Sequence, residues 1–165
     1  MSKNYLIVTA SESDIPIVQR IAAAAWKPTY GEILSVEQQA YMLAWMYDTE
    51  RLRQQMQAGV VFLLLKNEDT FCGYAAYEVF ENQHSKLHKL YFDPAEQGKG
   101  LGKILLEEVC LQLQKRACAS VELNVNRYNK SSFFYQKMGF VTVREEDIDV
   151  GENYFMNDFV MKKDL

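Results

Sequence analysis

Three glycines alternate with other residues in the six-residue run Gln97–Gly102. The run follows the extended apolar stretch Leu87–Phe92 and precedes an amphipathic helix that we expect from Leu101 to about Ala117. Glycine lets the backbone approach a ligand closely, and the free N–H groups at a helix start carry partial positive charge. The run therefore predicts an anion site suited to a pyrophosphate, although a plain strand-to-helix turn could contain the same glycines.

The spacing of these glycines does not fit the two commonest phosphate-binding loops. A dinucleotide-binding loop needs Gly-x-Gly-x-x-Gly near the first strand, whereas the glycines here stand at positions 98, 100 and 102. A P-loop needs a hydroxyl residue after Gly-Lys to hold magnesium, and here Ile104 follows Gly102 and Lys103. The sequence therefore indicates neither of these two sites.

Two segments together resemble the cofactor motifs of the GNAT superfamily of N-acetyltransferases. Phe92–Gly102 fits the pattern hydrophobic-x-Pro, then Gln/Arg-x-x-Gly-x-Gly/Ala, of that family's coenzyme A loop. Leu123–Phe140 is similar to its second motif, in which a strand and an Asn precede a short helix with an aromatic-Tyr pair and a Gly-Phe end. The step from Asn129 to Tyr135 is one residue shorter than is usual in the family, so either the loop is shorter or the Asn is displaced.

The resemblance implies acetyl-CoA as co-substrate and a role for each residue around it. Unpaired backbone groups of Leu90, Tyr91 and Phe92 would hold pantetheine and the thioester carbonyl, and Asn129 would contact the pantetheine. Tyr135 would protonate the leaving thiolate, because a phenol of pKa about 10 can donate to a thiolate of pKa about 8.5; a half-buried helix aromatic is the alternative for this residue. The pyrophosphate would be bound by Gln97, Gly98, Lys99, Gly100, Leu101, Gly102 and Lys103.

Two residues are candidates for the base that takes a proton from the acceptor amine. Alternation along the strand places His88 on one face with Leu90 and Phe92, and a group of pKa about 6.5 can accept a proton near neutral pH. Glu78, at the end of the preceding strand, could attract a cationic amine or relay a proton through water. A structural histidine in a mixed sheet is the alternative for His88.

Two aromatic-rich segments between Trp26 and Tyr47 resemble the amine-side helices of the PaiA-type subgroup of this family. Its members acetylate polyamines such as spermidine and spermine, so the resemblance implies a polyamine acceptor. Ammonium groups are attracted to the faces of aromatic rings. We therefore expect Trp26 and Tyr30 to bind the acceptor together with Glu78, whereas core packing is the favoured alternative for Trp45 and Tyr47.

Three classes of function are consistent with these motifs. The favoured one is direct transfer of acetyl from acetyl-CoA, in a ternary complex, to the primary amine of a small cationic acceptor such as a polyamine. The second is a regulatory acyl-CoA-binding protein with little turnover, and the third is acetylation of a protein N-terminus or lysine. Consumption of acetyl-CoA with a panel of amines separates the first two.

The composition is that expected of one soluble domain spanning all 165 residues. The net charge of −4 argues against direct nucleic-acid binding, and no apolar run approaches the ~20 residues of a membrane span. Cys72, Cys110 and Cys118 lack the Cys-x-x-Cys spacing of a zinc site, so no metal is expected. Met1–Ala10 lacks the pattern of a secretion signal, so we expect a cytoplasmic protein. The oligomeric state is open, and a homodimer is one outcome.

Hydrophobic periodicity predicts the element order β-α-α-α-β-β-β-α-β-α-β-β. We expect Pro28 to end the first helix, and Ser35 and Thr49 to cap the next two. The fold class is thus α/β (α+β): a GNAT-type mixed, mostly antiparallel central sheet with helices on both faces. The resemblance adds two parted strands at the acetyl-CoA site.

Overall fold

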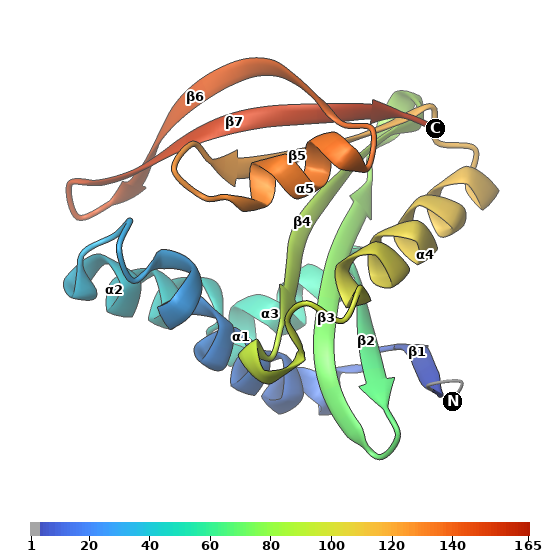
Figure 1. Ribbon diagram of the computed structural model, residues 1–165, viewed down its shortest axis with the longest axis horizontal. Helices are drawn as coiled ribbons and strands as arrows, with labels where there is room; N and C mark the ends of the chain where they lie inside the picture. The colour runs from blue at the N-terminus through green and yellow to red at the C-terminus, as the bar shows by residue number, and fades with distance from the viewer. Residues whose placement is uncertain (1–3) are drawn as a thin grey trace.

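A seven-stranded sheet with helices on both faces forms the protein (Figure 1), and the computed structural model describes residues 4–165. The first three residues of Met1–Ala10 lie outside the described part. The strands are β1 (Tyr5–Thr9), β2 (Val61–Asn67), β3 (Thr70–Val79), β4 (His84–Phe92), β5 (Ser120–Asn126), β6 (Val141–Gly151) and β7 (Tyr154–Asp164). The helices are α1 (Ile15–Tyr30), α2 (Val36–Met46), α3 (Thr49–Gln57), α4 (Leu101–Lys115) and α5 (Ser131–Lys137). Apart from three added 3-10 turns, this is the predicted element order.

The strands lie in the order β1-β2-β3-β4-β5-β7-β6. Every neighbouring pair is antiparallel except β4 and β5, which run parallel because α4 connects them across one face of the sheet. The predicted mixed, mostly antiparallel sheet is therefore confirmed.

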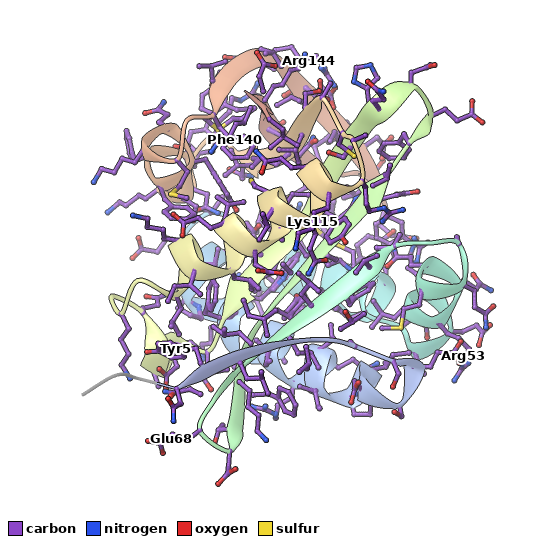
Figure 2. The ribbon with its side chains drawn as sticks, turned by 90° about the vertical axis from the view of Figure 1, so that its right-hand side faces the viewer. Tyr5, Arg53, Glu68, Lys115, Phe140 and Arg144 are labelled. Carbon is purple, nitrogen blue, oxygen red and sulfur yellow. The ribbon has the colours of Figure 1, made fainter. Side chains whose placement is uncertain are left out.

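Two hydrophobic cores lie on the two faces of the sheet. Leu63 and Leu65 of β2 face the core beneath α4 and α5, whereas Phe62 and Leu64 face the core beneath α1, α2 and α3. Figure 1 shows α4 on the near side of the sheet and α3 on the far side, and Figure 2 shows Phe140 beside α4. A strand that is covered on both faces reads as a continuous apolar run, which is what β2 shows in the sequence.

The first helix continues past the predicted stop, since α1 contains Pro28 and ends at Tyr30. Proline removes one helical hydrogen bond, to the carbonyl of Ala24, and both residues are exposed so that water can replace it. Trp26 and Tyr30, by contrast, are buried on the inner side of the helix. Burial of these two aromatic side chains outweighs the one lost bond.

The next two helices begin as follows. Ser35 caps α2 as predicted, and its hydroxyl accepts a hydrogen bond from the Gln38 N–H at 3.1 Å. Asp48, and not Thr49, caps α3, accepting from the Arg51 N–H at 3.1 Å. Asp is at least as good an N-cap as Thr, so the neighbouring carboxylate takes this position.

The tip of the β6–β7 hairpin reaches across to α2 (Figure 1). The Gln38 side chain donates to the Phe155 carbonyl at 2.9 Å, and the Tyr41 hydroxyl donates to the Val150 carbonyl at 2.8 Å. Within residues 4–165, no helix combines the length and the apolar composition needed to cross a bilayer. The three cysteines are buried as free thiols.

Candidate active site

Strands β4 and β5 are paired along only part of their length. Their pairing ends at Leu87 opposite Leu123, although β4 continues to Phe92 and β5 to Asn126. The predicted parting of two strands is therefore confirmed, and a cavity of about 130 Å³, here called the gap cavity, lies at this point. It is lined by Ala25, Thr29, Tyr30, Leu87, His88, Lys89, Leu90, Tyr91, Phe92, Gln97, Leu123, Asn124, Val125, Asn129, Ser131 and Tyr135.

A β-bulge lies in β4 where the gap begins. The successive β3 residues Ala76 and Tyr77 pair with Lys89 and Leu87, which leaves His88 as an extra residue without a partner on β3. A bulge of this kind bends the strand and shifts the alternation of its side chains by one residue. The strand therefore changes its course where its pairing with β5 ends.

His88 and Glu78 form a hydrogen-bonded pair beside the gap cavity, with the imidazole Nε2 2.7 Å from the Glu78 carboxylate. The preceding residue, Tyr77, donates a hydrogen bond to Gln112 on α4, so Glu78 points to the opposite face of the sheet. A carboxylate can only accept, so Nε2 carries a hydrogen and Nδ1 is left as the acceptor nitrogen of the neutral ring. The two residues that the sequence offers as rival bases thus form one unit.

The bulge overturns the predicted orientation of His88. Leu87 and Leu90 both pack into the α4 core although they are three residues apart, which simple alternation forbids. His88 instead meets Glu78 on the other face, so the prediction that it shares a face with Leu90 and Phe92 is wrong. Burial lowers the pKa of His88, and the hydrogen bond that the ring donates to Glu78 opposes this shift. The lowered pKa favours the neutral imidazole near pH 7.

The glycine-rich run forms one wall of a second cavity of about 410 Å³, here called the loop cavity. Gly98 and Gly100 have φ values of +79° and +76°, a left-handed conformation that glycine adopts without strain. Gly100 directly precedes α4, whose first N–H groups have no acceptor within the helix. The loop cavity is lined by Leu90, Phe92, Glu96, Gln97, Gly98, Gly100, Leu101, Gly102, Lys103, Ser131, Phe134 and Tyr135.

Two members of the predicted pyrophosphate loop have further contacts. Lys99 is absent from the cavity lining, and its ammonium group lies 3.0 Å from the Glu96 carboxylate. A Cβ atom on Gly102 would lie 3.2 Å from the Phe134 ring, so this glycine lets the start of α4 pack closely against α5. The free N–H groups of the helix, the left-handed glycines and Lys103, which lines the loop cavity, together fit a pyrophosphate.

Tyr135 lines both the gap cavity and the loop cavity. Its ring packs against Phe134, with centroids 5.3 Å apart, and edge-on against Phe140 at 5.8 Å. Burial raises the pKa of the phenol, so the hydroxyl keeps its proton at neutral pH. Tyr135 therefore offers a proton donor where the two cavities meet.

The four aromatic residues singled out from the sequence have different positions. Tyr30 lines the gap cavity, and its hydroxyl lies 2.9 Å from that of Tyr91. Trp26 is 1% exposed and packs behind Tyr30 at a centroid distance of 4.6 Å, so its ring is a support and not a wall of the gap cavity. Tyr47 is buried in the core, and Trp45 lies partly exposed beneath the Arg51 guanidinium.

Sequence reasoning did not single out four polar residues that line the gap cavity: Thr29, Lys89, Asn124 and Ser131. Asn124 alternates with the core residues Leu123 and Val125, so a polar side chain inside an apolar strand was the available signal. Ser131 begins α5 and lines both cavities. Among residues 4–165, no three His, Cys, Asp or Glu side chains are grouped as metal ligands would be.

A gap between parallel strands, next to a glycine-rich helix start, is the arrangement that the resemblance to acetyl-CoA-dependent transferases implies. Residues 32–157 match the acetyltransferase (GNAT) domain family. The chain belongs to this family, and its co-substrate is accordingly acetyl-CoA. The family and the enzyme class predicted from the sequence are confirmed.

Curated relatives with two kinds of acceptor resemble the chain. Spermidine N(1)-acetyltransferase from Thermoplasma acidophilum is 31% identical over 162 residues, which cover 93% of this chain and 92% of the relative. [Ribosomal protein bS18]-alanine N-acetyltransferase from Haemophilus influenzae is 27% identical over 139 residues, which cover 84% and 87%. The crystal structure of PaiA N-acetyltransferase from Thermoplasma acidophilum in complex with coenzyme A superposes with a TM-score of 0.84 at 28% identity, covering 98% of this chain and 99% of that one.

Proposed function

We propose that the protein transfers acetyl from acetyl-CoA directly to a primary amine of a small polyamine such as spermidine. One observation carries the proposal: a proton acceptor, His88, and a proton donor, Tyr135, line the same cavity at the gap between β4 and β5. The similarity to a spermidine acetyltransferase over most of both chains supports the choice of acceptor. The Glu78 carboxylate behind His88 would favour the approach of a cation.

The acceptor amine must lose a proton before it can attack, because a primary ammonium has a pKa of about 10.4. In the proposed mechanism the Nδ1 atom of His88 takes this proton, directly or through one water, and Glu78 stabilises the imidazolium that forms. A general base held in position in this way accelerates a reaction by about 10²–10⁴-fold.

Bound acetyl-CoA supplies a thioester that an amine can attack. The backbone groups of Leu90, Tyr91 and Phe92, which lie beyond the last pairing of β4 with β5, would orient the thioester and its carbonyl oxygen in the gap cavity. The Tyr135 hydroxyl would give its proton to the departing sulfur. Tyr30 would border the acceptor, Trp26 would support Tyr30 from behind, and Asn129 would contact pantetheine.

The proposal includes the remaining expectations from the sequence. We expect a single domain over residues 1–165 that acts in the cytoplasm on a small molecule, without direct nucleic-acid binding. The proposed residues all come from one chain, so the function does not depend on the oligomeric state. A homodimer is compatible with it.

A panel of acceptors tests the proposed substrate. We would measure kcat/KM for spermidine, spermine, a peptide with an N-terminal alanine and a lysine peptide at fixed acetyl-CoA. The proposal predicts that at least one polyamine exceeds both peptides by tenfold or more. If a peptide exceeds both polyamines tenfold, the protein is a peptide acetyltransferase. If coenzyme A binds but no acceptor is turned over, the regulatory alternative is favoured.

A further inference from the structure

A buried carboxylate without a counter-ion lies beside the gap cavity. Asp158 of β7 is 5% exposed, and its Oδ1 atom has no hydrogen-bond partner in the structure. Its Oδ2 atom accepts a single hydrogen bond, from Asn124 Nδ2 at 3.2 Å. Two carboxylate oxygens can accept about four hydrogen bonds, so most of this capacity is unused. Buried polar groups are normally satisfied, so this one needs an explanation.

Asp158 lies on the face of the sheet opposite to α4. Its neighbour Phe159 packs into the α4 core, as do Leu123 and Val125 on the adjacent strand, so alternation turns Asp158 and Asn124 the other way. This is also the face that carries the Glu78–His88 pair. Asn124 lines the gap cavity and bonds to Asp158, so the carboxylate lies directly next to the cavity lining.

The charged groups around Asp158 do not neutralise it. Burial raises the pKa of Asp158, the Asn124 hydrogen bond and the charges of Lys86 and Arg127 lower it, and Glu146 raises it. None of the cations in residues 4–165 comes within ion-pair distance of Asp158. Its charge also adds to the raised pKa of Tyr30, which is chiefly due to burial, so the field of Asp158 reaches the wall of the gap cavity.

Arg127, which follows β5, and Arg144 of β6 are already occupied. Arg127 bonds with Glu145 at 3.0 Å and with Asp147. Arg144, labelled in Figure 2 at the edge of the sheet, bonds with Glu122 and Glu146. Neither arginine is therefore available as a counter-ion for Asp158.

We infer that Asp158, together with Asn124, binds an ammonium group of the acceptor that stays charged during the reaction. An ammonium group only donates hydrogen bonds, which fits the free Asp158 Oδ1 and the Asn124 carbonyl oxygen. A carboxylate stabilises the charged form of a nearby amine, so it would hinder deprotonation of the attacking nitrogen. Asp158 therefore suits a second nitrogen, while the first reacts beside His88.

This inference rests on the proposed function and makes it more specific: the acceptor must carry at least two amines. Butane-1,4-diamine and butylamine differ only in the second ammonium group, so their ratio of kcat/KM isolates its contribution. We expect the wild-type protein to favour the diamine at least tenfold, since hydrogen bonds to charged groups are among the stronger ones.

The Asp158→Asn variant tests the inference. It should raise KM for the diamine tenfold or more, leave kcat/KM for butylamine within twofold, and leave acetyl-CoA affinity unchanged by calorimetry. Asp147→Asn is the matched control: it removes a carboxylate from the neighbouring strand, but an exposed one that Arg127 already neutralises. This control should keep the diamine preference.

The outcomes separate the two proposals. If the wild type prefers the diamine and Asp158→Asn keeps that preference, the inference is wrong and the proposed function stands. If the wild type turns over peptides and neither amine, both fail. If Asp158→Asn does not fold, calorimetry on the wild-type complex with coenzyme A decides: the diamine should bind at least tenfold tighter than butylamine, and equal affinities would overturn the inference.

Discussion

At the scale of single residues, the gap cavity brings together groups with opposite proton preferences. Burial lowers the pKa of His88, which favours the neutral ring, and raises the pKa of Tyr135, which keeps the phenol protonated. A base that starts unprotonated and an acid that starts protonated are what acetyl transfer from a thioester to an ammonium requires. Both side chains line one cavity, which supports the base and acid roles proposed for them.

Replacing Tyr135 with Phe removes the proton donor but keeps the ring that packs against Phe140. We expect kcat to fall by about 10²-fold or more, with acetyl-CoA affinity nearly unchanged, because the hydroxyl acts chiefly in the transition state. Steady-state kinetics and calorimetry measure the two effects. The control is Tyr77→Phe, which removes another buried hydroxyl, bonded to Gln112, outside the site. A Tyr135→Phe variant with wild-type kcat would mean that the hydroxyl has no catalytic role.

The pH dependence of kcat/KM should report on the Glu78–His88 pair. Protonated His88 cannot act as a base, so the rate should rise with pH through a pKa below the ordinary histidine value of about 6.5. Glu78 raises the pKa of His88, so Glu78→Gln should move this limb to lower pH. His88→Ala should abolish it. Profiles from pH 5 to 9 decide: an unshifted limb in Glu78→Gln, or a persisting limb in His88→Ala, assigns the titration to another group.

At the scale of elements, the start of α4 and the bulge in β4 determine the shape of the site. Gly98 and Gly100 turn the chain through left-handed conformations, and residues 100–103 at the start of the helix line the loop cavity. The bulge at His88 lies where β4 parts from β5. In the proposed mechanism, the start of α4 thus forms the binding surface for the donor, and the bulge directs His88 to the acceptor side.

Gly100→Val should lower coenzyme A affinity at least tenfold. A Cβ at this position meets no atom within 4 Å, so the effect comes from the φ of +76°, which valine resists, and from a side chain beside the loop cavity. Gly59→Val is the matched control, because Gly59 also has a left-handed φ, open space around it and no part in the cavities. Both variants should lose similar stability in thermal melts. Equal affinity in folded Gly100→Val would refute the assigned loop.

The sequence predicts the elements well where periodicity and glycine chemistry determine them, and less well where contacts distant in sequence do. Pro28 lies inside α1 because its side of the helix is exposed, which depends on what the helix packs against. The bulge at His88 depends on the register between β3 and β4. The pairing of Asn124 with Asp158 joins strands 34 residues apart. Such pairings leave no local pattern in the sequence. The hydrogen bond between Glu78 and His88 and the burial of Asp158 could therefore not be predicted.

At the scale of the whole molecule, the gap connects the two faces of the sheet. The loop cavity lies on the α4 and α5 side, whereas Glu78, His88 and Asp158 lie on the other. Donor and acceptor can therefore enter from opposite faces and meet in the gap cavity, with Tyr135 at the junction. This arrangement favours direct transfer within a ternary complex, without an acetylated enzyme intermediate.

A crystal structure with coenzyme A and spermidine bound tests this arrangement most directly. We predict the pyrophosphate on the N–H groups of Gly98–Lys103, and the coenzyme thiol within hydrogen-bond reach of the Tyr135 hydroxyl. One spermidine nitrogen should lie within reach of His88 Nδ1, directly or through one water. A thiol that points away from the gap cavity, or a spermidine bound on the same face as coenzyme A and remote from His88, would contradict the proposed mechanism.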